Sequence, residues 1–416
     1  MFRLFSRSAR PNQHDARRVL LRVEALEERD VPAGFFLTGV GGQTIPPQPF
    51  VRLVSTTTGP PVVVGPGNIN AFPGFAGEVR VANGDVNRDG TDDIICAQGP
   101  GPGSGSQITI FDGASALFRN TPVVIASFFA YSNTAGASQT PGFGGGVFVA
   151  SVDLNFDGFD EVITSPGAGA RGHIKVFNFN SFGGSFLGSN PQLRASFFAY
   201  TNFAGEVRVT TLTRLVGGAT VQFVVTASGA GTTQSDVRFY QNTFNINQVP
   251  DGVLVPPTLQ FFPYAGYLGG VSVAAGDTNG DNSEELFVST NGGIPSVRVF
   301  DINQVFVSQS ATPLPSREFV PFPGFIGQVR VGAADVNGDG SVEVLTSTGS
   351  APGAAGSPVK AFNVTGAPIT LLSFFAYPGY TGGVWLSTND FIPRRNQFFT
   401  PPTGITFSGG GFSFGP

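Results

Sequence analysis

The sequence predicts an all-β protein, a six-bladed β-propeller built from four-stranded antiparallel blades. Three observations favour this fold. A unit of roughly 60 residues repeats along the chain, a period typical of propellers and solenoids. Each unit contains short apolar runs of strand length. The 58 glycines and 32 prolines among 416 residues supply the turns between them. Apolar content stays at 41%, enough for a packed core and against disorder.

The first strand of each unit follows an aromatic residue and a glycine. The six starts are Gly74–Val79, Gly142–Val147, Asn202–Val207, Gly266–Val271, Gly324–Val329 and Gly379–Val384. Period-2 apolar runs such as Val79-Arg80-Val81 continue from them, which indicates β-strands. In a propeller, we expect these first strands to line the central channel.

The remaining strands follow in a fixed order. A polar loop and a second strand come next, as in Ile94-Ile95-Cys96, and then a Gly-rich turn. The third strands begin at Ile108, Ile174, Val237, Val297 and Val359. The fourth strand is clearest in Ser127–Tyr131, Ser196–Tyr200 and Ser373–Tyr377. Four strands per repeat are typical of a propeller blade.

The sixth blade is predicted to be a composite of both ends of the chain. Its C-terminal part supplies only the first strand, Val384–Leu386. Phe35–Thr38 and Phe50–Val54 are read as the second and third strands, and the segment before Phe72 as the fourth. The ring then closes through residues 35–72 pairing with 382–387. Such closure pairs edges that would otherwise stay open.

Four units carry the same nine-residue acidic loop between their first two strands. The loops are Asp85–Asp93, Asp153–Glu161, Asp277–Glu285 and Asp335–Glu343. Positions 1, 3, 5 and 9 carry side-chain oxygens, while position 7 varies, as expected if only its carbonyl oxygen is used. Ca²⁺ prefers several oxygen ligands of this kind. Position 6 is Gly, or Asn282 in the third loop, which suits a sharp left-handed turn.

We therefore predict four bound calcium ions. The expected ligands are Asp85, Asn87, Asp89, Thr91 and Asp93; Asp153, Asn155, Asp157, Phe159 and Glu161; Asp277, Asn279, Asp281, Ser283 and Glu285; and Asp335, Asn337, Asp339, Ser341 and Glu343. An EF-hand is excluded, since it needs flanking helices and a glutamate at position 12. A plain Asp-Gly turn without metal is the alternative for each loop. We expect no calcium at Thr211–Gly218 or Ser387–Asp390.

The order of these features resembles the FG-GAP (or VCBS) repeats of the integrin α-subunit propeller. Gly142-Phe143-Gly144, the loop from Asp153 to Glu161, and Ser165–Gly169 match that pattern in order. The resemblance covers about residues 34–390. It implies a calcium-binding propeller that acts in binding or adhesion outside the cell. The chain departs from the pattern in having six expected blades instead of seven and Asn at position 3 of every loop.

The two ends of the chain differ from the repeats. Residues 1–33 hold seven Arg and five acidic residues, and Leu26–Ala33 resembles a leader motif of planctomycete surface proteins. We interpret residues 1–33 as a leader or targeting segment, residues 34–390 as the propeller, and the Gly/Phe/Pro-rich residues 391–416 as a loose tail. No apolar run reaches the length of a membrane helix. Together these features indicate an extracellular or cell-surface protein.

Composition and charge limit the partners and activities expected of this chain. Net charge is −5, only two lysines occur, and no basic patch lies outside the first 30 residues, so nucleic acid is not an expected partner. His14 and His173 are the two histidines, and a catalytic triad needs a positioned imidazole. We therefore do not expect an enzyme. We expect a monomeric scaffold that binds an extracellular protein or glycan. A propeller enzyme acting on polysaccharide through a carboxylate pair and an architectural surface-layer component are the alternatives.

The first strands alternate in type around the expected ring. Units one, three and five carry Arg80, Arg208 and Arg330, preceded two residues earlier by Glu78, Glu206 and Gln328. Units two, four and six have glycine in place of that acidic or amide residue. Residues i and i+2 of a strand share a face. The three arginines therefore either form ion pairs that seal adjacent blades or form a site for an anionic ligand.

Overall fold

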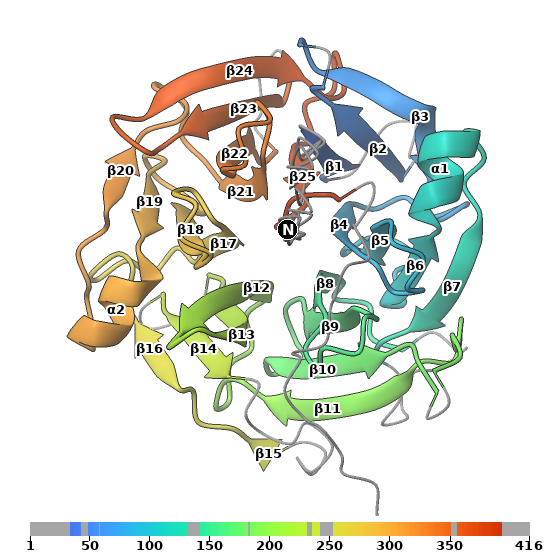
Figure 1. The fold of residues 1–416 in the computed structure, drawn as a ribbon, viewed down its shortest axis with the longest axis horizontal. Coiled ribbons are helices and arrows are strands. Elements are labelled where there is room, and N and C mark those ends of the chain that lie inside the picture. Colours follow the sequence, from blue (N-terminus) through green and yellow to red (C-terminus); the bar gives the residue numbers. More distant parts are fainter. Residues whose placement is uncertain are drawn as a thin grey trace, which may run out of the picture. The chain divides into compact units, whose positions relative to one another are not determined.

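The structure is a computed structural model that describes residues 34–42, 49–57, 59–131, 142–181, 184–230, 235–241, 253–350 and 356–392. The predicted leader, residues 1–33, lies outside the described residues, as does the predicted tail from residue 393 onward. The described chain forms six sheets arranged as blades around an axis (Figure 1), which confirms the predicted six-bladed β-propeller.

Each blade has four strands that run from an inner to an outer position and pair antiparallel with their neighbours. Blade 1 consists of β4 (Val79–Gly84), β5 (Asp93–Gln98), β6 (Gln107–Phe111) and β7 (Val124–Phe129). Blade 2 consists of β8 (Val147–Val152), β9 (Glu161–Pro166), β10 (His173–Asn178) and β11 (Gln192–Phe198). Blade 3 consists of β12 (Val207–Val216), β13 (Ala219–Ser228), β14 (Val237–Gln241) and β16 (Leu259–Phe261).

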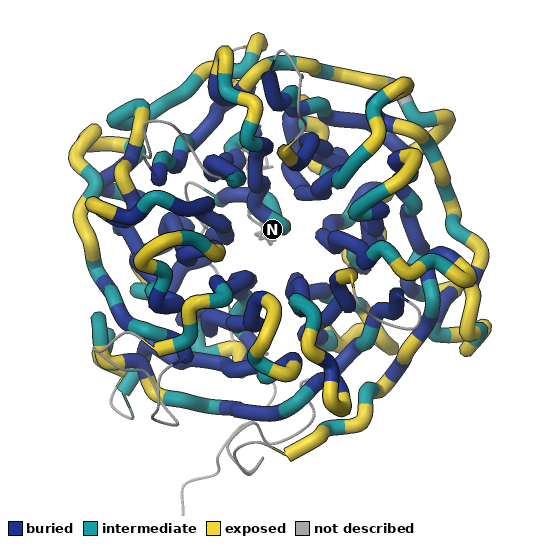
Figure 2. The backbone as a smooth tube through the Cα atoms, turned by 180° about the vertical axis from the view of Figure 1, so that it is seen from behind, coloured by how far each residue is buried: buried dark blue, intermediate teal, exposed yellow. Residues whose placement is uncertain are grey.

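Blades 4 and 5 repeat this order. Blade 4 consists of β17 (Val271–Gly276), β18 (Glu285–Thr290), β19 (Val297–Phe300) and β20 (Arg317–Phe319). Blade 5 consists of β21 (Val329–Ala334), β22 (Glu343–Thr348), β23 (Pro358–Asn363) and β24 (Ile369–Phe375). The inner and second strands are almost wholly buried, whereas the outer strands and loops carry the exposed residues (Figure 2).

Blade 6 is the composite of the two chain ends, as predicted. Its strands are β25 (Val384–Leu386), β1 (Phe35–Val40), β2 (Phe50–Ser55) and β3 (Val62–Asn70). β25 pairs antiparallel with β1, with Gly39 opposite Trp385. Beyond the strand, Phe391 is buried and lies 6.4 Å from the ring of Phe35. The propeller contacts therefore continue past the predicted boundary at residue 390.

Three elements go beyond the predicted four-stranded plan. α1 (Gly113–Arg119) and α2 (Ile302–Ser308) lie in the loops between third and fourth strands of blades 1 and 4. Asp112 and Asp301 cap them by accepting backbone N–H bonds of the first turn, as helix N-caps do. β15 (Val253–Leu254) pairs parallel to β11 and adds a fifth strand to blade 2.

A repeated cationic contact joins neighbouring blades. In five blades an Arg or Lys stands second or third in the third strand, and its side chain donates to a backbone carbonyl of the preceding blade. The donor and acceptor pairs are Arg52 and Ala376, Lys175 and Ala130, Arg238 and Ala199, Arg298 and Pro263, and Lys360 and Pro321. Each cation also lies over the aromatic ring that follows, Tyr377, Tyr131, Tyr200, Tyr264 or Phe322. Such cation–π contacts stabilise by roughly 0.5–2 kcal/mol.

Candidate functional site

All four acidic loops have the same backbone turn, between the first and second strands of blades 1, 2, 4 and 5. The position-1 carboxylate accepts the backbone N–H of position 6. The distances are 2.9 Å for Gly90 to Asp85, 2.8 Å for Gly158 to Asp153, 2.8 Å for Asn282 to Asp277 and 2.9 Å for Gly340 to Asp335. Position 6 has positive φ in every loop, 62° at Asn282 and 86–88° at the glycines. The predicted left-handed turn is therefore confirmed, including its asparagine.

The position-9 carboxylate closes each loop back onto its start. It accepts the backbone N–H of position 2, at 3.1 Å for Asp93, 2.8 Å for Glu161, 2.9 Å for Glu285 and 2.9 Å for Glu343. It also accepts the side-chain N–H of the position-3 asparagine, at 3.4, 2.8, 2.9 and 3.0 Å in the same order. One asparagine thus holds each loop closed, which accounts for Asn at this position throughout.

The position-9 carboxyl groups are electrostatically unusual. Burial is the main cause that raises the pKa of Glu161 to about 8 and the pKa of Glu285 to about 7. Burial also raises the pKa of Glu343 to about 7 and that of Asp93 well above its ordinary value. In each loop the carboxylates at positions 1 and 5 add to the shift, because like charges repel. Each loop therefore concentrates negative charge that a cation would stabilise.

The donor chemistry of the loops fits a hard cation, with three carboxylates, an asparagine oxygen and a backbone carbonyl in each. Within the described ranges, however, no three carboxylate, imidazole or thiolate groups lie close enough together to hold a metal ion as they stand. Calcium binding by the twenty predicted ligand residues thus stays a prediction.

Backbone hydrogen bonds link the acidic loops to their neighbours. Position 8 of one loop donates to the first residue of the preceding one: Asp160 to Asp85 at 2.9 Å, and Val342 to Asp277 at 2.8 Å. Glu284 donates to Thr213 at 2.9 Å, and its carboxylate accepts the Thr213 N–H at 2.5 Å. Blade 3, whose long β12–β13 hairpin has no acidic loop, is thereby joined to its neighbour. These bonds join the loop of blade 1 to that of blade 2, and they join the blade 3 hairpin and the loops of blades 4 and 5 to one another.

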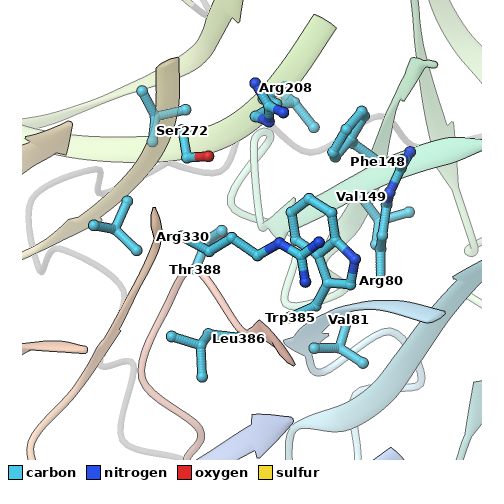
Figure 3. Close-up of a pocket in the computed structure, with 13 residues that line it drawn as sticks. Arg80, Val81, Phe148, Val149, Arg208, Ser272, Arg330, Trp385, Leu386 and Thr388 are labelled. Atoms are coloured by element: carbon cyan, nitrogen blue, oxygen red, sulfur yellow. The ribbon is translucent and has the colours of Figure 1, made fainter. Parts of the chain in front are cut away.

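The second site is the axial channel. The second residues of the six inner strands form a ring, here called the axial ring, in which arginine alternates with another residue (Figure 3). In order around the axis they are Arg80, Phe148, Arg208, Ser272, Arg330 and Trp385. All six are at least nine-tenths buried. A ring of apolar residues follows on the same strands, Val81, Val149, Val209, Val273, Val331 and Leu386.

The arginines of the axial ring are unequally paired. Arg80 forms an ion pair with Glu78 at 2.5 Å, and Arg208 pairs with Glu206 on its own strand. Arg330 has Gln328 at the corresponding position and reaches Glu78 only at 3.8 Å. Trp385 also donates to Glu78, at 3.1 Å. The predicted ion pairs are therefore present at two arginines, while the third shares an acid with Arg80.

Several guanidinium N–H groups of the axial ring are buried with no hydrogen-bond partner among the described residues. They are Nη1 of Arg80, Nε of Arg208, and Nε and Nη1 of Arg330. The guanidinium of Arg80 lies 3.5 Å from the centre of the Phe148 ring, and that of Arg330 lies 3.6 Å from the Trp385 ring. Burial is the main cause that lowers the pKa of Arg330 to about 10; Arg80 and Arg208 add to it, and Glu78 opposes it.

The segment after β25 crosses the axis beyond the apolar ring. Ser387 and Thr388 accept backbone N–H bonds from Ala333 of blade 5 and Ala275 of blade 4. The Asn389 side chain donates to the Ser151 carbonyl of blade 2, at 3.2 Å, and to Thr211 of blade 3. Thr388 lines the pocket, and its hydroxyl has no hydrogen-bond partner in the described chain. The pocket is therefore closed at this end. The sequence analysis did not predict that this segment closes the pocket, because Ser387–Asp390 is irregular and follows no strand or helix pattern.

His173, the histidine within the repeats, lies on β10, away from the inner strands. Its Nε2 is 2.6 Å from the hydroxyl of Ser196 on the neighbouring strand β11. No helix in the described residues is long and apolar enough to cross a membrane.

Comparison with known proteins assigns the chain to no family. No family model matches the sequence, and no curated relative does. Among solved structures, one match is the crystal structure of the exotype rhamnogalacturonan lyase YesX, with 13% sequence identity and a TM-score of 0.35. The match covers 80% of this chain and 64% of that enzyme, so the chain spans under two thirds of the enzyme's length. At this similarity the enzyme's activity carries no argument for this chain.

Proposed function

We propose that this protein is an exported, calcium-stabilised β-propeller that serves as a binding or adhesion scaffold for an extracellular protein or glycan. The observation that carries the proposal is the acidic loop, which has the same hydrogen-bonding scheme in four blades. Its resemblance to the loops of FG-GAP repeats agrees with this function.

The electrostatics of the loops support calcium as the stabilising ion. Burying carboxylates beside one another costs free energy, and a divalent cation offsets that cost. In each loop, positions 1, 3, 5, 7 and 9 would supply the oxygen atoms. The loops of blades 1 and 2 share a backbone hydrogen bond, as do those of blades 4 and 5, so an ion in one loop would also stiffen its neighbour. A stiff surface suits a scaffold, since less conformational entropy is lost when a ligand binds.

Calcium titration by calorimetry tests the metal. The wild-type chain is expected to bind four ions, with affinities of roughly 10⁻⁴–10⁻³ M, as in extracellular modules. Asp281→Asn removes a position-5 charge but keeps an oxygen that can accept the Ser283 N–H. It should bind three ions. Asp301→Asn, the same exchange at the cap of α2, is the matched control and should bind four. Two or fewer ions in the wild type, or four in Asp281→Asn, would contradict the assignment.

A glycan and protein-partner array tests the scaffold. The wild-type protein is applied with calcium and, in parallel, with excess chelator. Retention of specific ligands in calcium, with weaker retention in chelator, is the expected result. If the calcium-loaded protein retains nothing on either array, the scaffold function is wrong even if the calcium count is right.

A further inference from the structure

We propose that the axial pocket binds one small organic monocarboxylate between Arg80, Arg208 and Arg330. This site goes beyond the scaffold function and does not depend on calcium. It rests on three features of the described channel: its charge, its unpaired donors and its shape.

The charge of the axial ring selects a monoanion. Three guanidinium groups face two carboxylates, those of Glu78 and Glu206, which leaves one positive charge in excess. All three arginine residues are about 95% buried. A buried charge without a counter-charge is strongly unfavourable, so a single bound negative charge would restore the balance. A dianion would instead leave one negative charge in excess.

The donors of the ring match a carboxylate. Each of the three arginines has at least one buried N–H with no partner in the described structure, and these side chains line one pocket (Figure 3). Planar guanidinium groups bind carboxylates with paired hydrogen bonds. Phe148 and Trp385 already cover the faces of Arg80 and Arg330. The donors are therefore held in place before a ligand arrives, which lowers the entropic cost of binding.

The shape of the pocket selects a short apolar body. The five valines and Leu386 form its wall next to the arginines, and Thr388 lies at its closed end. The enclosed space measures about 30 Å³, so only a short group of a few heavy atoms fits. A carboxylate at the arginines would leave its hydrocarbon part against this apolar wall, where burial is favourable. Phosphate and sulfate have no such part.

Gln328 is the residue that leaves the ring charged. Glu78 and Glu206 lie directly beside Gly99 and Gly229, and Gln328 lies in the same way beside Gly349. The three side chains thus occupy equivalent places around the axis. Gln328→Glu would supply the missing third carboxylate without adding bulk. The added carboxylate is expected to neutralise the excess positive charge that otherwise attracts the ligand.

The test measures binding of acetate, propionate, butyrate and inorganic phosphate to the full chain, by calorimetry in calcium-saturated buffer free of other carboxylates. The wild type should bind one acetate or propionate per chain, and more tightly than phosphate. Gln328→Glu should weaken carboxylate binding by roughly tenfold or more. The new carboxylate competes for the Arg330 donors, and losing one charge-assisted hydrogen bond to the ligand corresponds to at least that factor. Its melting temperature without ligand should be equal or higher. Gln192→Glu, an exposed position on β11, is the matched control and should bind as the wild type does.

Arg330→Met provides a second variant that does not rely on the new carboxylate. It removes the excess charge and two of the unpaired donors but leaves Arg80 and Arg208 with their acids. It should fold and lose carboxylate binding. The proposal is overturned if the wild type binds no carboxylate at millimolar concentration. It is also overturned if either variant folds and binds as tightly as the wild type, or if phosphate binds more tightly than every carboxylate. Calcium stoichiometry, measured in parallel, reports on the loops separately.

Discussion

Removing β25 is expected to open the ring. A chain of residues 34–381 lacks the inner strand of blade 6, which pairs with β1 from Val40 opposite Val384 to Thr38 opposite Leu386. It also lacks the segment that crosses the axis. β1 would then present an unpaired edge to the channel, and exposed edges favour pairing with other chains.

The magnitude follows from the side chains that are lost. Val384, Trp385, Leu386 and Phe391 are 0%, 9%, 3% and 1% exposed. Burying one large apolar side chain stabilises by roughly 1.5–3 kcal/mol, so the four together contribute about 6–12 kcal/mol. This is an upper estimate, because unfolded chains already bury some surface. Since a domain is stable by only about 5–15 kcal/mol, the loss is comparable to the whole stability.

Urea unfolding and size-exclusion chromatography measure the effect. The chain of residues 34–392 retains every described strand and is expected to unfold cooperatively as a monomer. The chain of residues 34–381 is expected to unfold without a cooperative transition, or to self-associate. A peptide of residues 382–392 added in trans should restore the transition. A monomeric 34–381 chain with the same urea midpoint as 34–392 would refute the reasoning.

Three further outcomes are expected. Excess chelator should lower the melting temperature of the wild type, since an ion that binds only the folded state stabilises it; an unchanged melting curve would count against calcium. Arg298→Met should lower stability by roughly 1–3 kcal/mol, because it removes the contact over Tyr264 and a bond to a backbone carbonyl; urea unfolding beside the exposed control Arg119→Met checks this. Glu78→Gln should cost about 3–5 kcal/mol near neutral pH, because two buried arginines lose their shared acid.

The pH dependence of the Glu78→Gln effect has a definite sign. Burial raises the pKa of Glu78, but the charges of Arg80 and Arg330 outweigh it and hold that pKa below the ordinary value of 4.5. The stabilisation is therefore complete above pH 4.5 and is lost as the pH falls through the lower folded-state pKa. The stability difference between wild type and Glu78→Gln should shrink over that acid range. A difference that stays constant with pH would contradict the role of this carboxylate.

The sequence by itself determined the fold of this protein. Alternating apolar residues define strands locally, and a unit that repeats five times with four strands leaves a propeller as the simplest closed arrangement. The lone strand at Val384 and the surplus strands at Phe35 and Phe50 were enough to predict the composite blade. The turn at position 6 of each acidic loop was also readable, since a positive φ selects Gly or Asn.

Only the tertiary structure decided what the arginines do. Arg80, Arg208 and Arg330 are more than a hundred residues apart along the chain, and their shared pocket exists only because the ring brings their strands to one axis. The sequence could pair each arginine with the residue two positions earlier, as in Glu78 and Arg80. It could not show that Glu78 also forms an ion pair with Arg330 of another blade. Nor could it show that Thr388 lies at the closed end of the pocket. Local patterns report neighbours along a strand, whereas charge balance in a buried site depends on every group that folding brings together.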